Sequence, residues 1–402
     1  MAKFFDALET RSADERAADV ARHLPDLIKT AQTLDGYGDA VRAVNPSDIT
    51  SVDDLSQLPV LRKSELSTKQ HAQPPFGGLV KAQQHIFQSP GPLYEPGMKS
   101  HDWWRVARFL HACGIGPTDI VQNCFSYHFT PAGMIFESGA TAVGATVFPA
   151  GTGQTELQVR AAHDIGATAY AGTPDYLKVI LDKADELGTP LEISKAAVGG
   201  GPLFPALRQA YQDRGISCLQ NYATADLGNI AYESAAMDGM ILDEGVLVEI
   251  VTPGTGTRVP DGEIGEVVVT TLNTDYPLIR FATGDLSSIM PGLSPCGRTN
   301  NRITGWRGRA DQATKVKGMF VRPEQVAELV ARHDDVQKAR IIVRTVDQMD
   351  AMTVQLETKV TAPEVYADSI KDILKLRGEV ELVPPGHLPT DGIVIEDTRD
   401  FD

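Results

Sequence analysis

Helical and strand-like segments alternate through the middle of the chain, and this alternation most constrains its fold. Apolar residues recur at helical spacing in 103–113, 156–163 and 176–187, and short apolar runs lie at 145–148, 167–171 and 196–198. Glycine or proline turns separate these segments. Because strands that alternate with helices form βαβ units, we expect an α/β fold of mixed sheets with flanking helices.

The order of segments changes near residue 310. Residues 1 to about 75 are predicted to be helical, and two β-rich runs lie at 246–251 and 266–271. After residue 310 we expect a strand near 315–321, a helix at 323–332, strands at 339–343 and 352–357, a helix at 363–376 and a strand at 379–383. This order predicts a large N-terminal domain, residues 1–309, and a small α+β C-terminal domain, residues 310–402.

The chain is acidic, with 37 Lys and Arg against 53 Asp and Glu in 402 residues, a formal net charge of −16. This balance disfavours a nucleic-acid-binding protein or adhesion to an anionic membrane. No apolar run approaches the roughly 18 residues of a membrane span, and the N-terminus has no apolar core of a secretory signal. Four scattered cysteines without a CxxC pattern favour reduced thiols. We therefore expect a soluble, cytoplasmic protein.

Self-sufficient catalytic motifs are absent from the sequence. It has no HExxH, no GxSxG, no Walker A motif and no His pair at i, i+4, which disfavours a metal enzyme or a triad hydrolase. The segment 125–131 combines aromatic residues with His128. From the residues alone, His128 is either a satisfied histidine at a buried strand end or a residue that lines a pocket.

A local reversal of charge stands out at residues 298–322. This stretch holds seven Lys or Arg and one acid, Asp311, in an otherwise acidic chain. It is typical either of a site for a polyanionic small ligand at a domain junction or of a solvated basic loop.

Several short segments share the order and spacing of a known pattern. They are 5–10, 48–66, 275–285, 295–299 and 308–317. Together they resemble the phenylacetate–CoA ligase branch of the adenylate-forming (acyl-CoA synthetase) superfamily, nearly end to end. The resemblance implies that a carboxylic acid is joined to AMP from ATP with Mg²⁺ and then passed to coenzyme A. It also implies that the small C-terminal domain is mobile and rotates between these steps.

The resemblance assigns nucleotide-binding roles to matching residues. Asp285 matches the acid that accepts both ribose hydroxyls, Arg309 a second nucleotide-binding residue, and Asp311 the hinge of the small domain. The loop along adenine matches Gly200, Gly201 and Pro202, and the nucleotide loop matches Asn221, Tyr222, Ala223, Thr224 and Asp226. Tyr222 would stack on adenine, Thr224 or Ala225 would lie near the α-phosphate, and Asp226 would replace the glutamate that holds Mg²⁺.

The remaining substrate contacts follow from the same resemblance. Tyr127, His128 and Phe129 would line an acid pocket whose aromatic character suits an aryl or aryl-acetic acid. Lys315, Lys317 and Arg322 are expected on the side of the CoA phosphates because they are basic. A homodimer is the default expectation for such an enzyme.

Three departures from the family pattern bear on activity. The phosphate loop contains Pro90 and Pro92, which have no N–H to give, and Glu95 stands where a lysine is expected. Ile393 stands at the C-terminal position of the catalytic lysine, and losing such a donor costs about 10²–10³ in rate. Cys296 has Ser294 and Ser234 in place of cysteine partners, so we expect no structural zinc.

These departures leave three interpretations open. The first is an AMP-forming carboxylate–CoA ligase whose catalytic positions are Asp226, Thr224 and Ile393. Its adenylation step is either impaired or intact. The second is a nucleotide- or acyl-CoA-binding relative that has lost adenylation. The third is a ligase-fold enzyme that accepts a preformed acyl donor.

Overall fold

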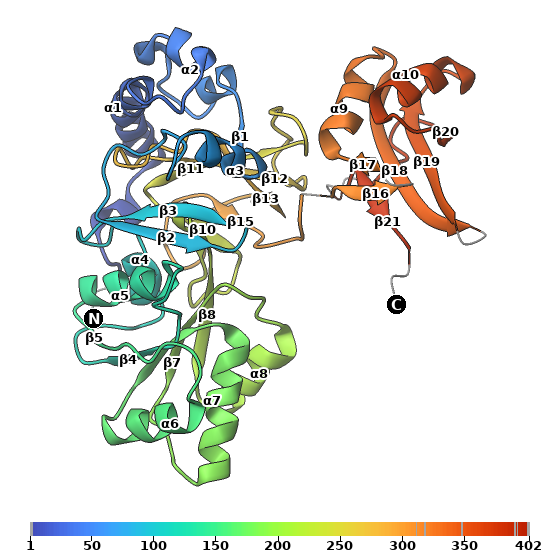
Figure 1. Cartoon of the computed structure of the whole chain (residues 1–402). Coiled ribbons are helices and arrows are strands. Elements are labelled where there is room, and N and C mark those ends of the chain that lie inside the picture. Colours follow the sequence, from blue (N-terminus) through green and yellow to red (C-terminus); the bar gives the residue numbers. More distant parts are fainter. Residues whose placement is uncertain are drawn as a thin grey trace.

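A computed structural model describes residues 3–310, 312–316, 319–346, 349–389, 391 and 393–399 of the chain. It has an α/β fold with mixed sheets and flanking helices, as expected (Figure 1). None of the helices in this described part combines the length and the apolarity needed to cross a bilayer.

A nine-stranded sheet lies at the centre of the N-terminal part. Its strand order is β14-β15-β10-β9-β8-β7-β6-β4-β5, parallel from β5 to β8 and antiparallel beyond β8. The bounds are β4 Ile120–Asn123, β5 Thr146–Phe148, β6 Ala169–Gly172, β7 Lys195–Val198, β8 Ser217–Thr224, β9 Gly228–Tyr232, β10 Met240–Leu242, β14 Ile289–Met290 and β15 Arg302–Ile303. The predicted strands near 146, 169 and 196 are thereby confirmed.

Helices cover both faces of the parallel strands, because consecutive residues of a strand such as β6 point to opposite faces and are all apolar. Ala169 and Ala171 of β6 pack toward α4 and α5, whereas Tyr170 between them packs toward α7 and α8. These helices and α6 have the bounds α4 Ala107–Ala112, α5 Ala132–Ala142, α6 Thr155–Asp164, α7 Pro174–Leu187 and α8 Pro205–Asp213. Burial on both faces is what a parallel sheet requires.

One predicted helix is too long. We expected a helix from residue 103, but α4 begins at Ala107. Arg105 has a φ of 64°, a left-handed backbone that a helix cannot contain, and Asp102 accepts the N–H groups of Val106 and Ala107. The apolar spacing of this segment therefore continues past the point where the backbone stops being helical.

A second sheet, β1-β13-β12-β11, packs against the N-terminal helices. Its bounds are β1 Leu61–Arg62, β13 Phe281–Ser287, β12 Gly265–Thr271 and β11 Val246–Val251, so both predicted β-rich runs are confirmed. The helices are α1 Ala13–Gln32, α2 Asp39–Ala43 and α3 Lys63–Ala72, with short 3₁₀ turns at Ala7–Thr10, Pro46–Asp48 and Asp54–Gln57. Leu24, Leu27 and Ile28 of α1 share one apolar core with this sheet.

The predicted phosphate loop is the turn of a β-hairpin. Strands β2 (His85–Ser89) and β3 (Leu93–Gly97) are antiparallel, and residues 90–92 join them. Only Gly91 in this turn has a backbone N–H to donate, because its two neighbours are prolines.

The C-terminal part has its own core. A four-stranded sheet, β20-β19-β18-β21, packs on two helices, and a hairpin of β16 and β17 precedes it. The bounds are β16 Thr314–Val316, β17 Met319–Val321, α9 Pro323–Ala331, β18 Val336–Val346, β19 Met349–Thr358, α10 Glu364–Leu374, β20 Glu379–Val383 and β21 Ile395–Asp397. Leu329, Ile341, Val354 and Tyr366 are completely buried in it. The two predicted helices and the predicted strands at 339–343, 352–357 and 379–383 are confirmed. The single strand expected near 315–321 is instead the hairpin of β16 and β17, and β21 was not predicted.

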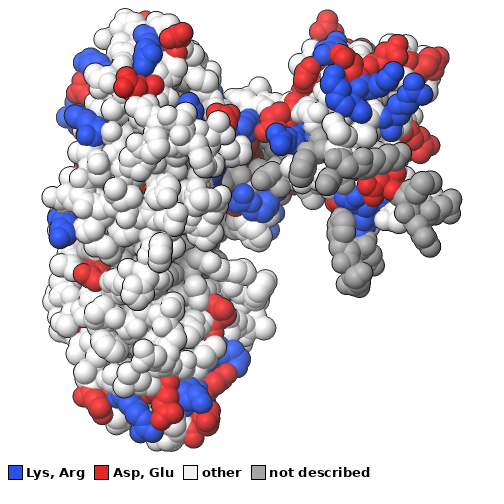
Figure 2. All heavy atoms as spheres, in the orientation of Figure 1, with Lys and Arg blue, Asp and Glu red and all other residues white. Residues whose placement is uncertain are grey.

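The two parts meet at the start of α9. Arg62 forms an ion pair with Glu324 at 3.6 Å, and the Gly254 backbone lies directly against that of Pro323. Figure 1 shows the C-terminal elements as a separate body beside α3 and β12, and Figure 2 shows charged side chains of both signs near this junction. The boundary at residues 309 and 310 stays a prediction.

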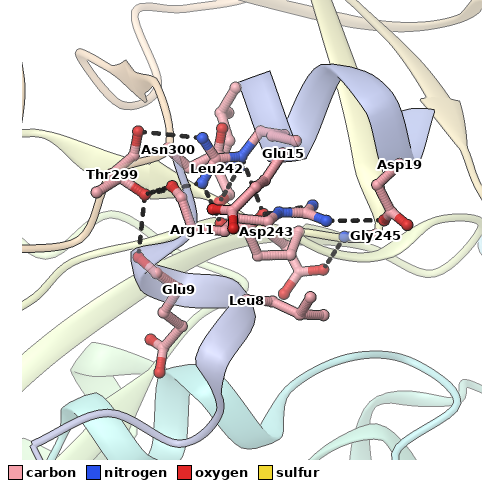
Figure 3. Close-up of polar contacts among 12 residues, drawn as sticks. Leu8, Glu9, Arg11, Glu15, Asp19, Leu242, Asp243, Gly245, Thr299 and Asn300 are labelled. Atoms are coloured by element: carbon pink, nitrogen blue, oxygen red, sulfur yellow. Dashed lines mark hydrogen bonds and ion pairs between the residues drawn. The ribbon is translucent and has the colours of Figure 1, made fainter. Parts of the chain in front are cut away.

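The N-terminal segment is tied to the far end of the large sheet. Thr299 donates its N–H to the Glu9 carbonyl and its hydroxyl to the Arg11 carbonyl, at 3.0 and 2.6 Å (Figure 3). Arg298 forms a buried ion pair with the Glu9 carboxylate, and Asn300 donates to the Leu242 carbonyl at 3.0 Å. The first residues described are thus held by residues almost 300 positions later.

Candidate active site

A cleft of about 440 Å³ lies where α3, the β2–β3 hairpin, β13 and α9 meet. Its walls include the Arg62–Lys63 step, the turn at Pro90 and Gly91, and Thr283 and Gly284 of β13. Arg309, Pro323 and Glu324 close its other side. A second hollow, of about 740 Å³, adjoins it at Arg62 and Gly254.

Asp285 is the polar centre beside this cleft. Its carboxylate accepts hydrogen bonds from the Tyr222 hydroxyl at 2.8 Å, the Trp306 indole N–H at 3.1 Å and the Arg309 guanidinium at 2.9 Å. Asp285 itself is buried, whereas Trp306 and the Arg309 side chain are more than half exposed. The structure therefore brings together three of the predicted nucleotide-binding residues, Tyr222, Asp285 and Arg309, around one carboxylate.

Tyr222 is held in place by its strand. It lies on β8 and also contacts the Thr283 hydroxyl at 3.0 Å. Burial raises the pKa of its phenol far above the usual value, and the Asp285 charge acts in the same direction. The hydroxyl therefore remains a donor at neutral pH.

The predicted glycine loop and nucleotide loop touch each other. A Cβ on Gly199 would lie 2.3 Å from the Asn221 side-chain oxygen, so the glycine allows the two loops to approach closely. Asn221 donates to Asn229 at 2.9 Å. Gly200, with a φ of 70°, and Gly201 and Pro202 follow β7 at the same end of the sheet.

Thr224 ends strand β8 and fixes the turn that carries Asp226. The Thr224 hydroxyl accepts the Leu227 N–H at 3.1 Å, and Ala223 pairs with Asn229 across the two strands. The turn places Asp226 in a buried position, 4% exposed, where one carboxylate oxygen lies 2.7 Å from the Lys63 ammonium.

Glu95 lies beside this ion pair on strand β3. It is completely buried, and neither of its carboxylate oxygens has a hydrogen-bond partner. Burial, together with the negative charge of Asp226, raises the pKa of Glu95 to about 8, against the smaller lowering effects of Ser89 and Lys63. A carboxyl group thus occupies the position of the expected loop lysine in a buried environment.

The predicted acid-pocket residues lie on the loop between β4 and α5. Asn123 donates to the Tyr127 hydroxyl at 2.8 Å, and burial raises the pKa of that phenol. His128 and Phe129 are exposed, Phe129 at 76%, so His128 is not the buried histidine of the first interpretation. The Phe129 carbonyl accepts the Gln88 N–H at 2.8 Å, which joins this loop to the hairpin.

The predicted site residues of the C-terminal part are Ile393, Arg322 and Lys315. Ile393 is 37% exposed, and its backbone contacts Asp391 and Arg340 within the C-terminal part. Arg322 is exposed immediately before Pro323, which lines the cleft. Lys315 lies in β16. Asp311 and Lys317 lie outside the described residues.

The basic stretch at 298–322 divides into two groups. Arg298 and Arg302 are 5% and 3% exposed, and they form ion pairs with Glu9 and Asp238. These two arginines therefore stabilise the fold. Of the stretch, Arg309 faces the cleft, so the reversal of charge is neither entirely a ligand site nor a solvated loop.

Cys296 lies near Arg298 at the edge of the large sheet. Burial opposes ionisation of its thiol, but hydrogen bonds from Ser294 and the Arg298 N–H bring its pKa below the usual value. Among the described residues, no group of three or more His, Cys, Asp and Glu is arranged to hold a metal ion. The absence of zinc stays a prediction.

Lys63 and Trp306 are site residues whose place the sequence did not predict. Lys63 appeared only within a family-like segment, and nothing local shows that it reaches Asp226. The available signal was a basic pair, Arg62–Lys63, at a strand-to-helix junction. Strand β1 pairs with β13 at Leu61 and Phe281, which places Lys63 near Thr283 of β13.

Comparisons with known proteins place the chain in a family. No family model matches the chain. It is 30% identical over 336 residues to a phenylacetate-coenzyme A ligase of Aromatoleum evansii, covering 79% of this chain and 75% of that one. It is 29% identical to the enzyme of that name from Escherichia coli, covering 96% and 94%.

The fold is similar to that of a solved structure. A 2-hydroxyisobutyryl-CoA ligase in an open conformation aligns with a TM-score of 0.70 at 24% identity, covering 95% of this chain and 91% of that one. With the identity and coverage of its curated relatives, the chain belongs to the phenylacetate–CoA ligase family of adenylate-forming enzymes.

Proposed function

We propose that the chain is an AMP-forming carboxylate–CoA ligase that acts on an aryl or aryl-acetic acid. The observation that carries the proposal is the Asp285 carboxylate, with Tyr222 and Arg309 on it, beside a cleft that also contains Lys63. The curated relatives are named phenylacetate-coenzyme A ligases, which supports the aromatic acid.

In the first half-reaction an oxygen of the acid attacks the α-phosphorus of ATP, which forms an acyl-adenylate and releases pyrophosphate. Asp285 accepts the ribose hydroxyls, and Trp306, whose indole is half exposed, gives up its hydrogen bond to make room. Tyr222 packs on the base with its hydroxyl fixed to Asp285. Tyr127, His128 and Phe129 face the acid.

Lys63 and Arg309 supply the positive charge that the proline-containing turn cannot. Both line the cleft together with Pro90 and Gly91. Their charges lie where negative charge develops on the leaving phosphates, which is the most effective use of a fixed cation. The buried Asp226 has one carboxylate oxygen without a partner and fits the role of an Mg²⁺ ligand. Mg²⁺, when bound, neutralises phosphate charge.

In the second half-reaction the CoA thiol attacks the acyl carbonyl, and AMP leaves. Arg322 lies one residue before the cleft wall, and with Lys315 and Lys317 it binds the CoA phosphates. Between the half-reactions, the C-terminal domain rotates about Asp311 and presents a different face to the cleft.

A panel of aryl acids with ATP, Mg²⁺ and CoA tests the activity. We expect that at least one aromatic acid of the panel leads to release of AMP and pyrophosphate in equal amounts, and that neither product forms without an acid. AMP binding without pyrophosphate release from any acid would contradict the proposal and favour the nucleotide-binding alternative. CoA thioester formation only from a supplied acyl-adenylate would favour an enzyme that uses a preformed acyl donor.

Variants at Lys63 and Ile393 separate the half-reactions. Lys63→Ala should slow pyrophosphate release by about 10²-fold, and Ile393→Lys, which restores the family lysine, should accelerate it. Neither change should alter thioester formation from a supplied acyl-adenylate by more than a few-fold. Ile393→Leu is the matched control. Equal rates of adenylation in Ile393→Lys and Ile393→Leu would show that residue 393 does not reach the substrate.

A further inference from the structure

The Asp285 carboxylate is already largely occupied by the protein's own donors. One of its oxygens accepts the Trp306 indole N–H at 3.1 Å and the Arg309 guanidinium at 2.9 Å, and the other accepts the Tyr222 hydroxyl at 2.8 Å. An ionised carboxylate offers about four acceptor positions. Donors from the described residues therefore fill three of these positions, which leaves one for a ligand.

Two ribose hydroxyls need two positions on this carboxylate, so one of the three donors has to leave. Tyr222 is fixed on strand β8 and also contacts the Thr283 hydroxyl at 3.0 Å. The Arg309 bond joins two charged groups, and such bonds are stronger than those of a neutral donor. The Trp306 indole is neutral, and the residue is 55% exposed. Trp306 is therefore the donor that a second hydroxyl displaces at the lowest cost.

The backbone next to Trp306 is fastened to the strand that carries Asp285. The Arg307 N–H donates to the Leu286 carbonyl at 2.8 Å, and the Leu286 N–H donates to the Gly308 carbonyl at 2.9 Å. These bonds keep the Trp306 backbone beside the carboxylate whether or not a ligand is bound. The indole consequently leaves Asp285 by rotation of its own side chain, and it returns when the ligand dissociates.

We propose that Trp306 is a specificity-determining residue that competes with one ribose hydroxyl for Asp285. This inference rests on the proposed function, because it needs a nucleotide at Asp285. The competing hydroxyl gains only the difference between its own hydrogen bond and that of the indole, whereas the other hydroxyl uses the open position. The site therefore binds a ribonucleotide less tightly than Asp285 would without Trp306, and it discriminates less against a nucleotide that lacks the competing hydroxyl.

Titration calorimetry of the full chain with AMP, 2′-deoxy-AMP and 3′-deoxy-AMP, without acid or CoA, tests this competition. Trp306→Phe keeps an aromatic ring but has no N–H to donate. We expect AMP to bind this variant about 3- to 10-fold more tightly than wild type, because its second hydroxyl no longer displaces a donor. The deoxy analogue that lacks the competing hydroxyl should bind both proteins equally, and the other analogue should gain as AMP does.

Trp103→Phe is the matched control, because the Trp103 indole makes the same kind of hydrogen bond, also at 3.1 Å, to a different carboxylate, Asp275. It should leave the affinity for all three nucleotides unchanged. Equal AMP affinity in wild type and Trp306→Phe overturns the proposal. An equal gain for AMP and both deoxy analogues also overturns it, because the bulk of the indole would then limit binding.

The same titrations separate failure of this inference from failure of the proposed function. AMP that binds wild type and Trp306→Phe with one affinity contradicts only the role of Trp306 and leaves the nucleotide site standing. AMP that binds neither wild type nor either variant contradicts the nucleotide site itself, and the role of Trp306 with it.

Discussion

Asp102 shows at the residue scale how a single carboxylate sets both a backbone boundary and a pH dependence. It starts α4 by accepting the N–H groups of Val106 and Ala107 at 2.8 and 3.1 Å. Burial raises the pKa of Asp102 to about 6 against the lowering effect of the Ala107 N–H, and Asp243 adds to the rise. Its folded-state pKa is therefore above the unfolded value of about 3.9.

Asp102→Asn should stabilise the protein at neutral pH. The stability that wild-type Asp102 contributes is present below pH 4 and is lost as pH rises through about 6. Asparagine keeps the acceptor without the charge. The gain in unfolding free energy should be near zero at pH 4 and reach on the order of 1–3 kcal/mol above pH 7. Urea unfolding at several pH values measures it, with exposed Asp261→Asn as control; a gain independent of pH would contradict the assignment.

The sequence predicts a site residue where a short local pattern identifies it. Tyr222, Asp285 and Arg309 were predicted from their segments, and the structure places them within hydrogen-bond distance; their nucleotide role stays a prediction. Lys63 and Glu95 were not predictable as neighbours of Asp226, because these three residues come from three different parts of the chain. Their proximity depends on tertiary packing, which local patterns do not contain.

At the scale of elements, the turn that joins β11 to β12 controls how the C-terminal part docks. Gly254 has a φ of 80°, and a Cβ there would lie 2.6 Å from the Pro323 carbonyl carbon. The nearby Arg62–Glu324 ion pair is partly exposed and contributes little by itself. The missing side chain at Gly254 therefore allows the start of α9 to lie directly against this turn.

Gly254→Ala should displace α9 from the cleft. Gly262→Ala, in the same connection, is the matched control, because Gly262 also has a positive φ but open space around its Cα. Both variants should lose about 1–2 kcal/mol of stability from backbone strain. Only Gly254→Ala should enlarge the radius of gyration in small-angle X-ray scattering. Identical scattering from the two variants would show that the contact does not set the arrangement.

Element types were predictable from periodicity, but their ends were not. The strands of β6 and β7 follow from short apolar runs between turns, as expected for strands buried on both faces. The predicted start of α4 was wrong, because the spacing of apolar residues does not reveal a left-handed backbone conformation such as that of Arg105. Strand β21 was missed because it is three residues long and pairs with a strand more than 50 positions away.

At the scale of the whole molecule, the C-terminal part has an apolar core that is separate from the cores of the N-terminal part. The C-terminal core surrounds Leu329 and Tyr366, whereas Trp103, Trp104 and Trp306 all lie in the N-terminal part. Tryptophan fluorescence therefore reports on one body, and far-ultraviolet circular dichroism reports on both. This arrangement allows their stabilities to be measured separately.

Leu329→Ala should separate the two unfolding transitions. Removing this buried side chain should cost the C-terminal body about 2–5 kcal/mol. The midpoint by circular dichroism should then fall below the midpoint by fluorescence. Leu24→Ala, in the N-terminal core, should shift the fluorescence midpoint instead. Coincident transitions in Leu329→Ala would show that the two bodies unfold as one.

The link between Glu9 and Arg298 has a consequence for synthesis on the ribosome. The two residues are 289 positions apart, so the carboxylate leaves the exit tunnel long before its guanidinium partner exists. At about 5–20 residues per second, the interval is on the order of 15–60 s. The Glu9–Arg298 ion pair therefore forms late in maturation of the N-terminal body, after Arg108 and Glu244, which pair with Asp6 and Arg11, have been synthesised.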